Sequence, residues 1–322
     1  MRSSISLHRF GAIVAAIFVA MSACGGSSAP KPRVAPAYPL DAVLQVNDIQ
    51  VIGTHNSYHL RPPRTLAPGD VADYEHPALD EQLNRQGVRT FELDVFNGPG
   101  FPVAHTPVID ATSNCPDLAT CLGVLRSWSS AHPGHVPIFV LIEPKTQTLV
   151  LDKTFVAWDA AAIPRIDDTV RRALPPGQLL TPDQVRGKSS TLRAAVVGRG
   201  WPTLGTTRGR IAVVLNTAGP VRDLYLAGRP ALEGAPLFVT ADERAPSAAV
   251  LKRDEPAAGE VRRLAAQGFI VRSLTDDRNV EARANDHTRA NIAIDNGVQL
   301  VSSDYPVADA AIGPYEIGRA HV

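Results

Sequence analysis

Short apolar runs recur along the chain from residue 49 onward, and longer polar or amphipathic segments separate them. The runs are rich in Val, Ile and Leu and almost uninterrupted, a pattern typical of parallel strands buried on both faces of a sheet. Eight runs are predicted to be strands, at residues 49–53, 88–95, 101–105, 136–142, 210–215, 236–240, 269–274 and 298–303. Eight strands joined by crossovers predict a single-domain (β/α)8 TIM barrel of the α/β class.

Three of the separating segments are predicted to be helices. Residues 77–87 and 257–268 each end in a glycine that is suited to a helix C-cap, and residues 281–297 form the third predicted helix. Residues 144–209 are too long for one crossover, so we interpret them as an elaborated loop.

The N-terminal segment has a different pattern. Arg2 and Arg9 come before an apolar run at residues 10–21, which is shorter than the roughly 20 residues needed to cross a bilayer. A basic start followed by a short apolar run and small residues is typical of an export signal, which we assign to residues 1–23.

The apolar run leads into "MSAC", residues 21–24, which resembles the bacterial lipoprotein box with Met21 where Leu is usual. Cys24 is therefore expected to carry a diacylglycerol and to anchor an exported protein in the cell envelope, with free secretion as the alternative. The following segment, residues 24–44, is rich in Pro and Gly and is interpreted as a flexible tether.

Composition and charge are those of an ordinary globular protein. The chain has 32 basic and 32 acidic residues and is 44% hydrophobic and 20% charged. Removal of the export signal takes away two basic residues and no acidic one, which leaves a net charge of −2. Nucleic-acid binders usually carry a strong basic excess, so we expect no nucleic-acid partner.

Cys115 and Cys121 are expected to form a small local disulfide. Exported proteins meet an oxidising compartment, where neighbouring cysteines pair. Their spacing does not suit a zinc pair, and no histidine lies near them in the sequence.

Polar side chains gather where the predicted strands end. They are His55 and Asn56, Glu92 and Asp94, His105, Glu143 and Lys145, and later Asn216, Asp242, Arg272 and Asp304. In a (β/α)8 barrel these ends meet on one face, where active sites lie. Side chains alternate along a strand, so Glu92 and Asp94 point to the same face and Leu93 points to the other.

Three carboxylates and an amide oxygen in one place favour a hard dication, either calcium or magnesium. Two histidines from different segments are suited to proton transfer on opposite sides of a reacting centre. A dication together with two imidazoles favours the cleavage of a phosphodiester, because both can stabilise charge on phosphate oxygens.

Four motifs, "GTHNSYH", "FELDVFNG", "PVAHT" and "FVLIEPK", occur in this order and resemble the X-region of phosphoinositide-specific phospholipase C. They are most similar to the bacterial calcium-dependent branch. The similarity extends to "GFIVRSLTDD" and "LVSSDYP", and so covers about residues 45–315. It implies a barrel of the phospholipase C-like phosphodiesterase type over these residues.

The resemblance also implies a role for each matching residue. His55 is expected to stabilise the phosphorane-like transition state, and His105 to be the general acid that protonates the diacylglycerol oxygen. The base is left open between His55 and a metal-bound carboxylate. The expected calcium ligands are Asn56, Glu92, Asp94 and Glu143, and the candidates for contact with phosphate or inositol are Lys145, Arg272 and Asp304.

In this family the inositol 2-hydroxyl attacks the phosphorus and gives a cyclic phosphate that water can open. The resemblance therefore implies a calcium-dependent phosphoric diester hydrolase that acts on phosphatidylinositol-type lipids at a membrane surface. We recognise no regulatory lipid-binding module in the sequence, so the substrate is expected to be a plain inositol lipid or another phosphodiester. A monomer is expected, and no protein partner is implied.

Two alternatives are kept. A glycerophosphodiester phosphodiesterase uses a similar barrel but typically begins with His-Arg-Gly, where this chain has "HNS". A catalytically silent lipoprotein that binds inositol phosphates or glycans would have lost a histidine or a metal ligand, whereas all six expected positions are filled here.

Three further features are interpreted as having no function. His59 and His76 fall outside the pattern of expected catalytic and metal-binding residues and are taken as loop residues. The ending "EIGRAHV", residues 316–322, matches a translated sequencing adapter and is suspected to be an artefactual tail.

Overall fold

The computed structural model describes residues 38–62, 72–107, 110–146 and 155–318. The predicted export signal, Cys24, most of the predicted tether and the last four residues of the suspected tail lie outside the described residues. No helix among the described residues is both long enough and apolar enough to cross a membrane.

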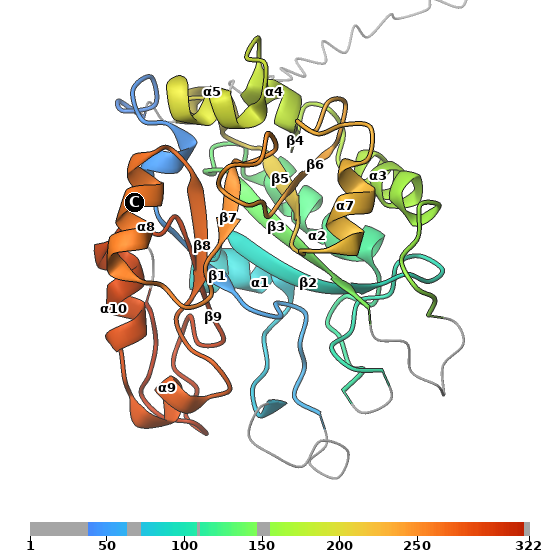
Figure 1. The fold of residues 1–322 in the computed structure, drawn as a ribbon. Coiled ribbons are helices and arrows are strands. Elements are labelled where there is room, and N and C mark those ends of the chain that lie inside the picture. Colours follow the sequence, from blue (N-terminus) through green and yellow to red (C-terminus); the bar gives the residue numbers. More distant parts are fainter. Residues whose placement is uncertain (1–37, 63–71, 108–109, 147–154, 319–322) are drawn as a thin grey trace, which may run out of the picture. The chain divides into compact units, whose positions relative to one another are not determined.

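A curled parallel sheet forms the centre of the fold (Figure 1). Its strands follow one another in the order β4-β5-β3-β2-β1-β9-β8-β7, and β6 also pairs with β5. A single parallel bridge from Thr240 to Val250 joins the end of β6 to β7 and closes the ring. The predicted (β/α)8-type barrel is therefore confirmed. The strands are β1 Val51–Thr54, β2 Thr90–Phe96, β3 Ile138–Lys145, β4 Leu179–Leu180, β5 Ile211–Leu215, β6 Leu237–Val239, β7 Val250–Lys252, β8 Ile270–Leu274 and β9 Leu300–Ser303.

The helices surround this sheet, and α8 and α10 pack against β8. Capping side chains set several of the helix starts: Asp117 accepts a hydrogen bond from the backbone of Thr120 at α2, and Thr181 forms a capping box at α4. The helices are α1 Leu79–Glu81 continued by a π-helical turn Gln82–Gln86, α2 Leu118–Ala131, α3 Ala162–Ala173, α4 Pro182–Arg186, α5 Leu192–Gly198, α6 Leu204–Thr207, α7 Pro220–Leu226, α8 Ala258–Ala266, α9 Val280–Ala284 and α10 Thr288–Asp295.

One predicted strand is wrong and one barrel strand was missed. Residues 101–105 form no barrel strand, because Val103 and Pro102 make only isolated antiparallel bridges, to Val95 and Asp117. The eighth barrel strand is β7, which has only three residues and is followed by the charged run at 252–255, so its apolar signal is too short to detect.

Two predicted segments have a different secondary structure from the one expected. Residues 144–209 are not a plain loop, since they contain α3, α4, α5, α6 and β4. The predicted helix at 281–297 is split into α9 and α10, because Asn285 adopts a left-handed conformation with φ of 50° between them.

Strands β1 and β2 approach each other closely. Gly53 lies opposite Thr90 in the parallel register, and a Cβ atom at Gly53 would be 2.6 Å from the Cβ of Thr90. Glycine at this position therefore lets the end of β1 lie directly against β2, where the predicted site residues begin.

Candidate active site and metal centre

The ends of β1, β2 and β3 bring the predicted metal ligands to one edge of the barrel. Glu92 and Asp94 lie on β2, and the parallel register sets Asp94 directly opposite Glu143 of β3. Asn56 follows β1, and the backbone N–H of the next residue, Ser57, donates to the carbonyl oxygen of Glu92. Asn56 has φ of 43°, a left-handed conformation that asparagine tolerates, and this turns the chain at the end of the strand.

Glu92 is buried and has partners at both carboxylate oxygens. Asn216 donates to Oε1 at 2.9 Å, and Arg272 forms an ion pair with Oε2. Burial raises the pKa of Glu92, but the Arg272 guanidinium outweighs burial, so the net pKa lies below its usual value. Glu92 is therefore held ionised.

Asp94 and Glu143 share one ammonium group. The Nζ of Lys145 lies 2.6 Å from Asp94 Oδ2 and 3.2 Å from Glu143 Oε1, and Lys252 lies 3.7 Å from the other oxygen of Glu143. Burial raises the pKa of Asp94 above its usual value despite Lys145. The negative charge of this buried carboxylate is thus only partly balanced.

The donors at this edge are suited to calcium. Three carboxylates and one amide are hard oxygen ligands, and no thiolate lies among them. A buried carboxylate with incomplete charge balance is stabilised by a nearby cation. The oxygens of Asn56, Glu92, Asp94 and Glu143 are of the kind that Ca²⁺ prefers, but among the described residues the carboxylates of Glu92, Asp94 and Glu143 do not form a group whose ligand atoms all lie within 4.8 Å of one another. Calcium binding by these four residues stays a prediction.

His55 is held by a carboxylate at the end of β9. Its Nδ1 lies 3.0 Å from Asp304 Oδ1, and its side chain remains 29% exposed while that of Asp304 is buried. Burial lowers the pKa of His55, but Asp304 and then Glu92 outweigh it and raise the net value to about 9. Asp304 is in turn fixed by Asp276, whose carboxylate accepts a hydrogen bond from the backbone of Asp304 at 2.9 Å.

His105 lies on the segment that follows β2 and is also held by a carboxylate. Its Nδ1 is 2.8 Å from Asp110 Oδ2, and its side chain is 35% exposed. The same oxygen of Asp110 lies 3.0 Å from the Nε2 of His59. Burial raises the pKa of Asp110, but the hydrogen bonds from His105 and His59 outweigh burial and lower the net value to about 2.

His59 and His76 lie in the connection between β1 and α1, as predicted, but both side chains are buried beside the site instead of being exposed. His59 contacts Asp110, and the Nε2 of His76 lies 2.9 Å from the carbonyl oxygen of His55. Neither residue matched an expected catalytic or metal-binding position, and a sequence motif carries no information about burial.

The three residues predicted to contact the substrate, Lys145, Arg272 and Asp304, each form an ion pair within the protein. Asp304 is the partner of His55, and Lys145 lies between the carboxylates of the predicted metal ligands. Arg272 is buried and forms ion pairs with Glu92 and Asp254, so its guanidinium faces carboxylates instead of an open pocket.

Sequence reasoning missed Asp110, Tyr74 and Asp276. Tyr74 accepts a hydrogen bond from the amide of Asn56 at 2.9 Å, and Asp110 lies 51 residues after its partner His59. No local pattern marks such residues, because their roles depend on contacts between distant segments. Asp276 falls within the quoted motif "GFIVRSLTDD", and its position next to β8 was the one available signal.

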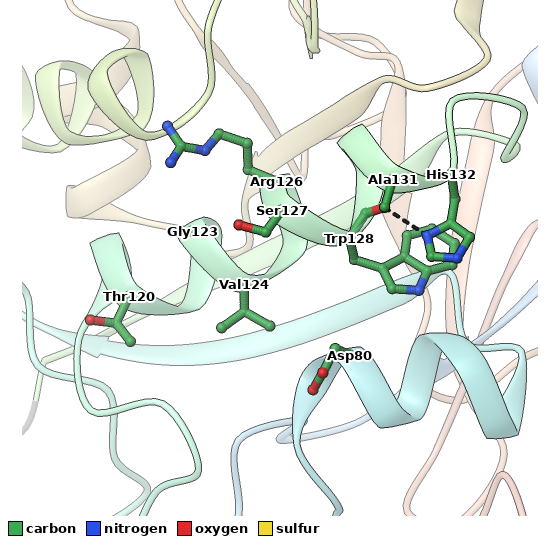
Figure 2. Close-up of a pocket in the computed structure, with 9 residues that line it drawn as sticks. All are labelled: Asp80, Thr120, Gly123, Val124, Arg126, Ser127, Trp128, Ala131 and His132. Carbon is green, nitrogen blue, oxygen red and sulfur yellow. Dashed lines mark hydrogen bonds between the residues drawn. The ribbon is translucent and has the colours of Figure 1, made fainter. Parts of the chain in front are cut away.

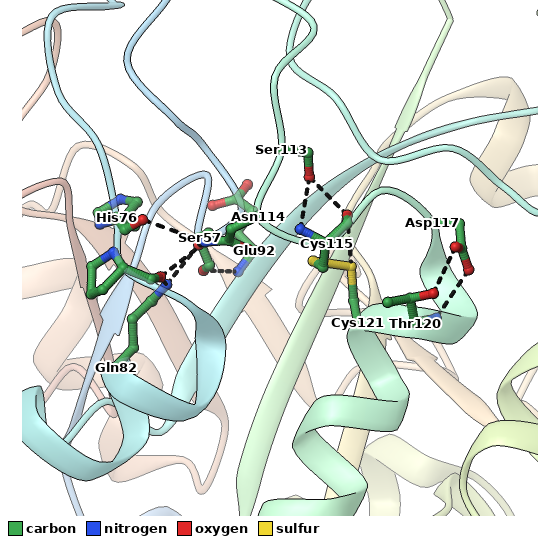
Figure 3. Close-up of a disulfide and its surroundings, with 11 residues drawn as sticks. Ser57, His76, Gln82, Glu92, Ser113, Asn114, Cys115, Asp117, Thr120 and Cys121 are labelled. Atoms are coloured by element: carbon green, nitrogen blue, oxygen red, sulfur yellow. Dashed lines mark hydrogen bonds between the residues drawn. A yellow bond between two sulfur atoms is a disulfide. The ribbon is translucent and has the colours of Figure 1, made fainter.

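The predicted disulfide is present between Cys115 and Cys121, close to the site (Figure 3). It joins the segment after His105 to the start of α2. Asn114, next to the disulfide, donates hydrogen bonds to the carbonyl oxygens of Ser57 and Pro77 at 3.2 and 2.9 Å. The disulfide-bonded segment is therefore tied to the chain that follows β1.

Of two cavities in the structure, one lies beside the proposed catalytic residues and the other does not. A cavity of about 570 Å³ between α1 and α2 is lined by Asp80, Trp128 and other residues that belong to none of the predicted clusters (Figure 2). A second cavity, of about 530 Å³, is lined by Asp304 and His76 among others. The second cavity therefore adjoins the His55–Asp304 pair, whereas the first has no convergent catalytic groups.

Comparison with known proteins agrees with the motifs. A family model described as "Phosphoinositide phospholipase C, Ca2+-dependent" matches residues 44–98 and 96–321. No curated protein matches the chain.

Solved structures with similar folds include three bacterial enzymes. The calcium-dependent phosphoinositol-specific phospholipase C of Pseudomonas sp. in its myo-inositol complex is 21% identical, with a TM-score of 0.59 over 83% of this chain and 92% of the other. The Ca²⁺-dependent phosphatidylinositol-specific enzyme of Streptomyces antibioticus is 19% identical, with a TM-score of 0.60 over 82% and 95%. The phosphatidylinositol-specific enzyme of Listeria monocytogenes is 14% identical, with a TM-score of 0.52 over 84% and 92%.

At these identities the solved structures establish the shared fold, and the family model, which spans most of the chain, establishes the family. The resemblance inferred from the four ordered motifs is thereby confirmed. The chain belongs to the family of Ca²⁺-dependent phosphoinositide phospholipases C and is a phospholipase C-like hydrolase.

Proposed function

We propose that this protein cleaves phosphatidylinositol-type lipids into diacylglycerol and an inositol phosphate that is first released in its cyclic form. The observation that carries the proposal is a pair of histidines, each held at Nδ1 by a buried carboxylate: His55 by Asp304 and His105 by Asp110. A hydrogen bond at Nδ1 leaves Nε2 of each ring available to the substrate. The inositol head group is supported by family membership and by the similar Pseudomonas enzyme, which was solved with myo-inositol.

Each histidine has a separate task in the proposed reaction. The oxygen of the inositol 2-hydroxyl forms a bond to phosphorus while the bond from phosphorus to the glycerol oxygen breaks. His105 gives a proton to the departing glycerol oxygen, and His55 stabilises the negative charge that develops on the phosphate. The proton of the 2-hydroxyl passes to a carboxylate of the proposed metal centre, because a pKa of about 9 keeps His55 protonated near neutral pH.

Four side chains would hold calcium: Asn56, Glu92, Asp94 and Glu143. When bound, calcium supplies positive charge to a phosphate oxygen and acidifies the attacking hydroxyl. Arg272 contributes by keeping Glu92 ionised within the barrel.

The test is release of water-soluble inositol phosphate from phosphatidylinositol vesicles in the presence of calcium, magnesium or a chelator. We expect release with calcium and none with the chelator. His105→Ala should lower turnover by about 100-fold or more, because a general acid contributes on the order of 10²–10⁴-fold. Calcium binding measured by calorimetry should remain close to that of the wild type, since His105 is not among the proposed ligands.

Two further variants complete the design. Glu92→Gln should weaken calcium binding, because it removes one charged ligand. His132→Ala is the matched control, because His132 is an exposed histidine directly after α2 that stacks on Trp128. Calcium binding without release of any inositol phosphate would overturn the proposed reaction and favour a silent binding protein.

A further inference from the structure

One carboxylate joins two imidazoles beside the proposed general acid. Asp110 Oδ2 lies 2.8 Å from His105 Nδ1 and 3.0 Å from His59 Nε2, and its Oδ1 lies 3.1 Å from the same His59 nitrogen. The rings of His59 and His105 meet edge to face, with centroids 5.9 Å apart. His59, Asp110 and His105 thus form a continuous chain of contacts, which we call the His–Asp–His chain.

The inner end of the His–Asp–His chain is fixed by the protein core. The side chain of His59 is fully buried, and its Nδ1 lies 3.1 Å from the carbonyl oxygen of Tyr74. Its ring stacks on that of Tyr74 at 4.4 Å between centroids. Its backbone N–H donates to Asn56, and its carbonyl oxygen accepts from His76, so neither the ring nor the backbone is free to move.

The outer end of the His–Asp–His chain, His105, is held by few structural elements. His105 and Asp110 lie on the same connection between β2 and α2, and the backbones of Thr106 and Asp110 are joined by an isolated antiparallel bridge. This connection contains no helix or strand of the barrel in its described residues. His105 is the exposed member of the chain, at 35% of its side chain, while Asp110 is buried. The orientation of His105 therefore depends on what holds Asp110.

We propose that His59 is a positioning residue for the general acid His105 and acts through Asp110. By donating a hydrogen bond from the core, His59 fixes the Asp110 carboxylate, and this carboxylate then holds Nδ1 of His105 so that Nε2 is presented to the leaving group. This inference rests on the proposed function only in assigning the general acid to His105. The contact geometry itself is independent of that assignment.

The test compares two substrates that differ in their need for an acid. Phosphatidylinositol has an alcohol leaving group, which must be protonated, whereas a p-nitrophenyl ester of inositol phosphate has a leaving group that departs as its anion. His59→Phe keeps an aromatic ring against Tyr74 and removes the donor to Asp110. We expect kcat for phosphatidylinositol to fall by about 10- to 100-fold, a part of the full general-acid effect, while kcat for the p-nitrophenyl ester changes by less than about threefold.

A conservative variant and a matched control distinguish positioning from stability. His59→Gln keeps a donor that can reach Asp110 and should restore part of the lost kcat. His135→Phe makes the same substitution at another buried histidine, which lies beside Ser129, away from the proposed site. It should lower the melting temperature without changing the ratio of the two rates. Equal losses on both substrates in His59→Phe, or no loss on either, would overturn the proposal.

A measurement without substrate separates this inference from the proposed function. In ¹⁵N NMR spectra, His105 of the wild type should show a protonated Nδ1, and His59→Phe should show a mixture of ring tautomers. If the wild type cleaves neither substrate, the proposed function fails, and the NMR result still decides the positioning role. An unchanged His105 tautomer in His59→Phe would refute it.

Discussion

At the residue scale, the most informative feature is a buried negative charge that one lysine partly balances. Lys145 stands two positions after Glu143 on β3, and its Nζ contacts both Glu143 and Asp94. An ammonium at this position and a calcium ion would satisfy the same carboxylates. If the proposed calcium site is correct, the two cations compete, and the lysine must release the carboxylates when calcium binds.

We predict that Lys145→Met binds calcium more tightly, because the competing ammonium is gone. A gain of about tenfold is expected, which corresponds to roughly 1.4 kcal/mol, and calorimetry without substrate measures it. Lys188→Met, at an exposed lysine after α4, is the control and should leave the affinity unchanged. Weaker calcium binding in Lys145→Met would contradict the competition and would indicate that the lysine supports the metal centre.

At the element scale, the site depends on how closely β1 lies against β2. The sequence pattern located seven of the eight barrel strands, because buried parallel strands are long, apolar and β-branched. The pattern missed β7, which has only three residues. It also predicted a barrel strand at 101–105, but this apolar run is a connection outside the barrel and contains His105. Apolar character alone cannot tell a barrel strand from a connection that packs on the core.

We predict that Gly53→Ala disturbs both stability and activity. The new Cβ would lie 2.6 Å from the Cβ of Thr90, so the two strands must separate. Overpacking of this kind costs about 1–3 kcal/mol, which urea denaturation can measure. Turnover should fall as well, since His55 and Asn56 directly follow β1.

The matched control for this substitution is Gly123→Ala in α2. No atom lies within 4 Å of a Cβ at Gly123, so the added methyl group meets open space. Alanine in a helix is more stable than glycine by about 0.5–1 kcal/mol, and this variant should therefore gain stability. A Gly53→Ala protein with wild-type stability and turnover would show that the strand contact does not hold the site.

At the scale of the whole molecule, the barrel is expected to act at a membrane surface, because its proposed substrate is a lipid. We propose that Cys24 carries a diacylglycerol and that the chain after it tethers the barrel to the cell envelope. The predicted tether, residues 24–44, reaches too far along the chain, because its described part lies on the barrel: Asp41 forms an ion pair with Arg208, and Leu44 packs against the core. The support for this proposal is the sequence "MSAC" after a short apolar run with a basic start.

We predict that Cys24→Ser moves the protein from the membrane fraction to the soluble fraction of cells that express it. Loss of the acyl chains removes about 0.8 kcal/mol of membrane affinity for each buried methylene group. Immunoblots of the separated fractions measure the shift. Cys115→Ser is the matched control, because its sulfur belongs to the disulfide, and it should stay with the membrane. Equal partitioning of Cys24→Ser and the wild type would favour the freely secreted form.

The sequence by itself determined the family and the type of barrel, and it named the residues that are proposed to carry the chemistry. Local patterns carry this information, because strand periodicity and short ordered motifs such as "GTHNSYH" and "FELDVFNG" are read from neighbouring residues. The disulfide between Cys115 and Cys121 was also predictable, since the two cysteines are close in the chain and no histidine lies near them in the sequence.

Only the tertiary structure decided which residues hold the reactive groups in place. His55 with Asp304, His105 with Asp110 and His59, and Glu92 with Arg272 are partnerships that the sequence did not reveal. Most of them join segments far apart in the chain, and closure of the barrel brings those segments together. The physical reason is that a side chain's burial and partners depend on which strand ends meet in space, and local sequence patterns do not record this.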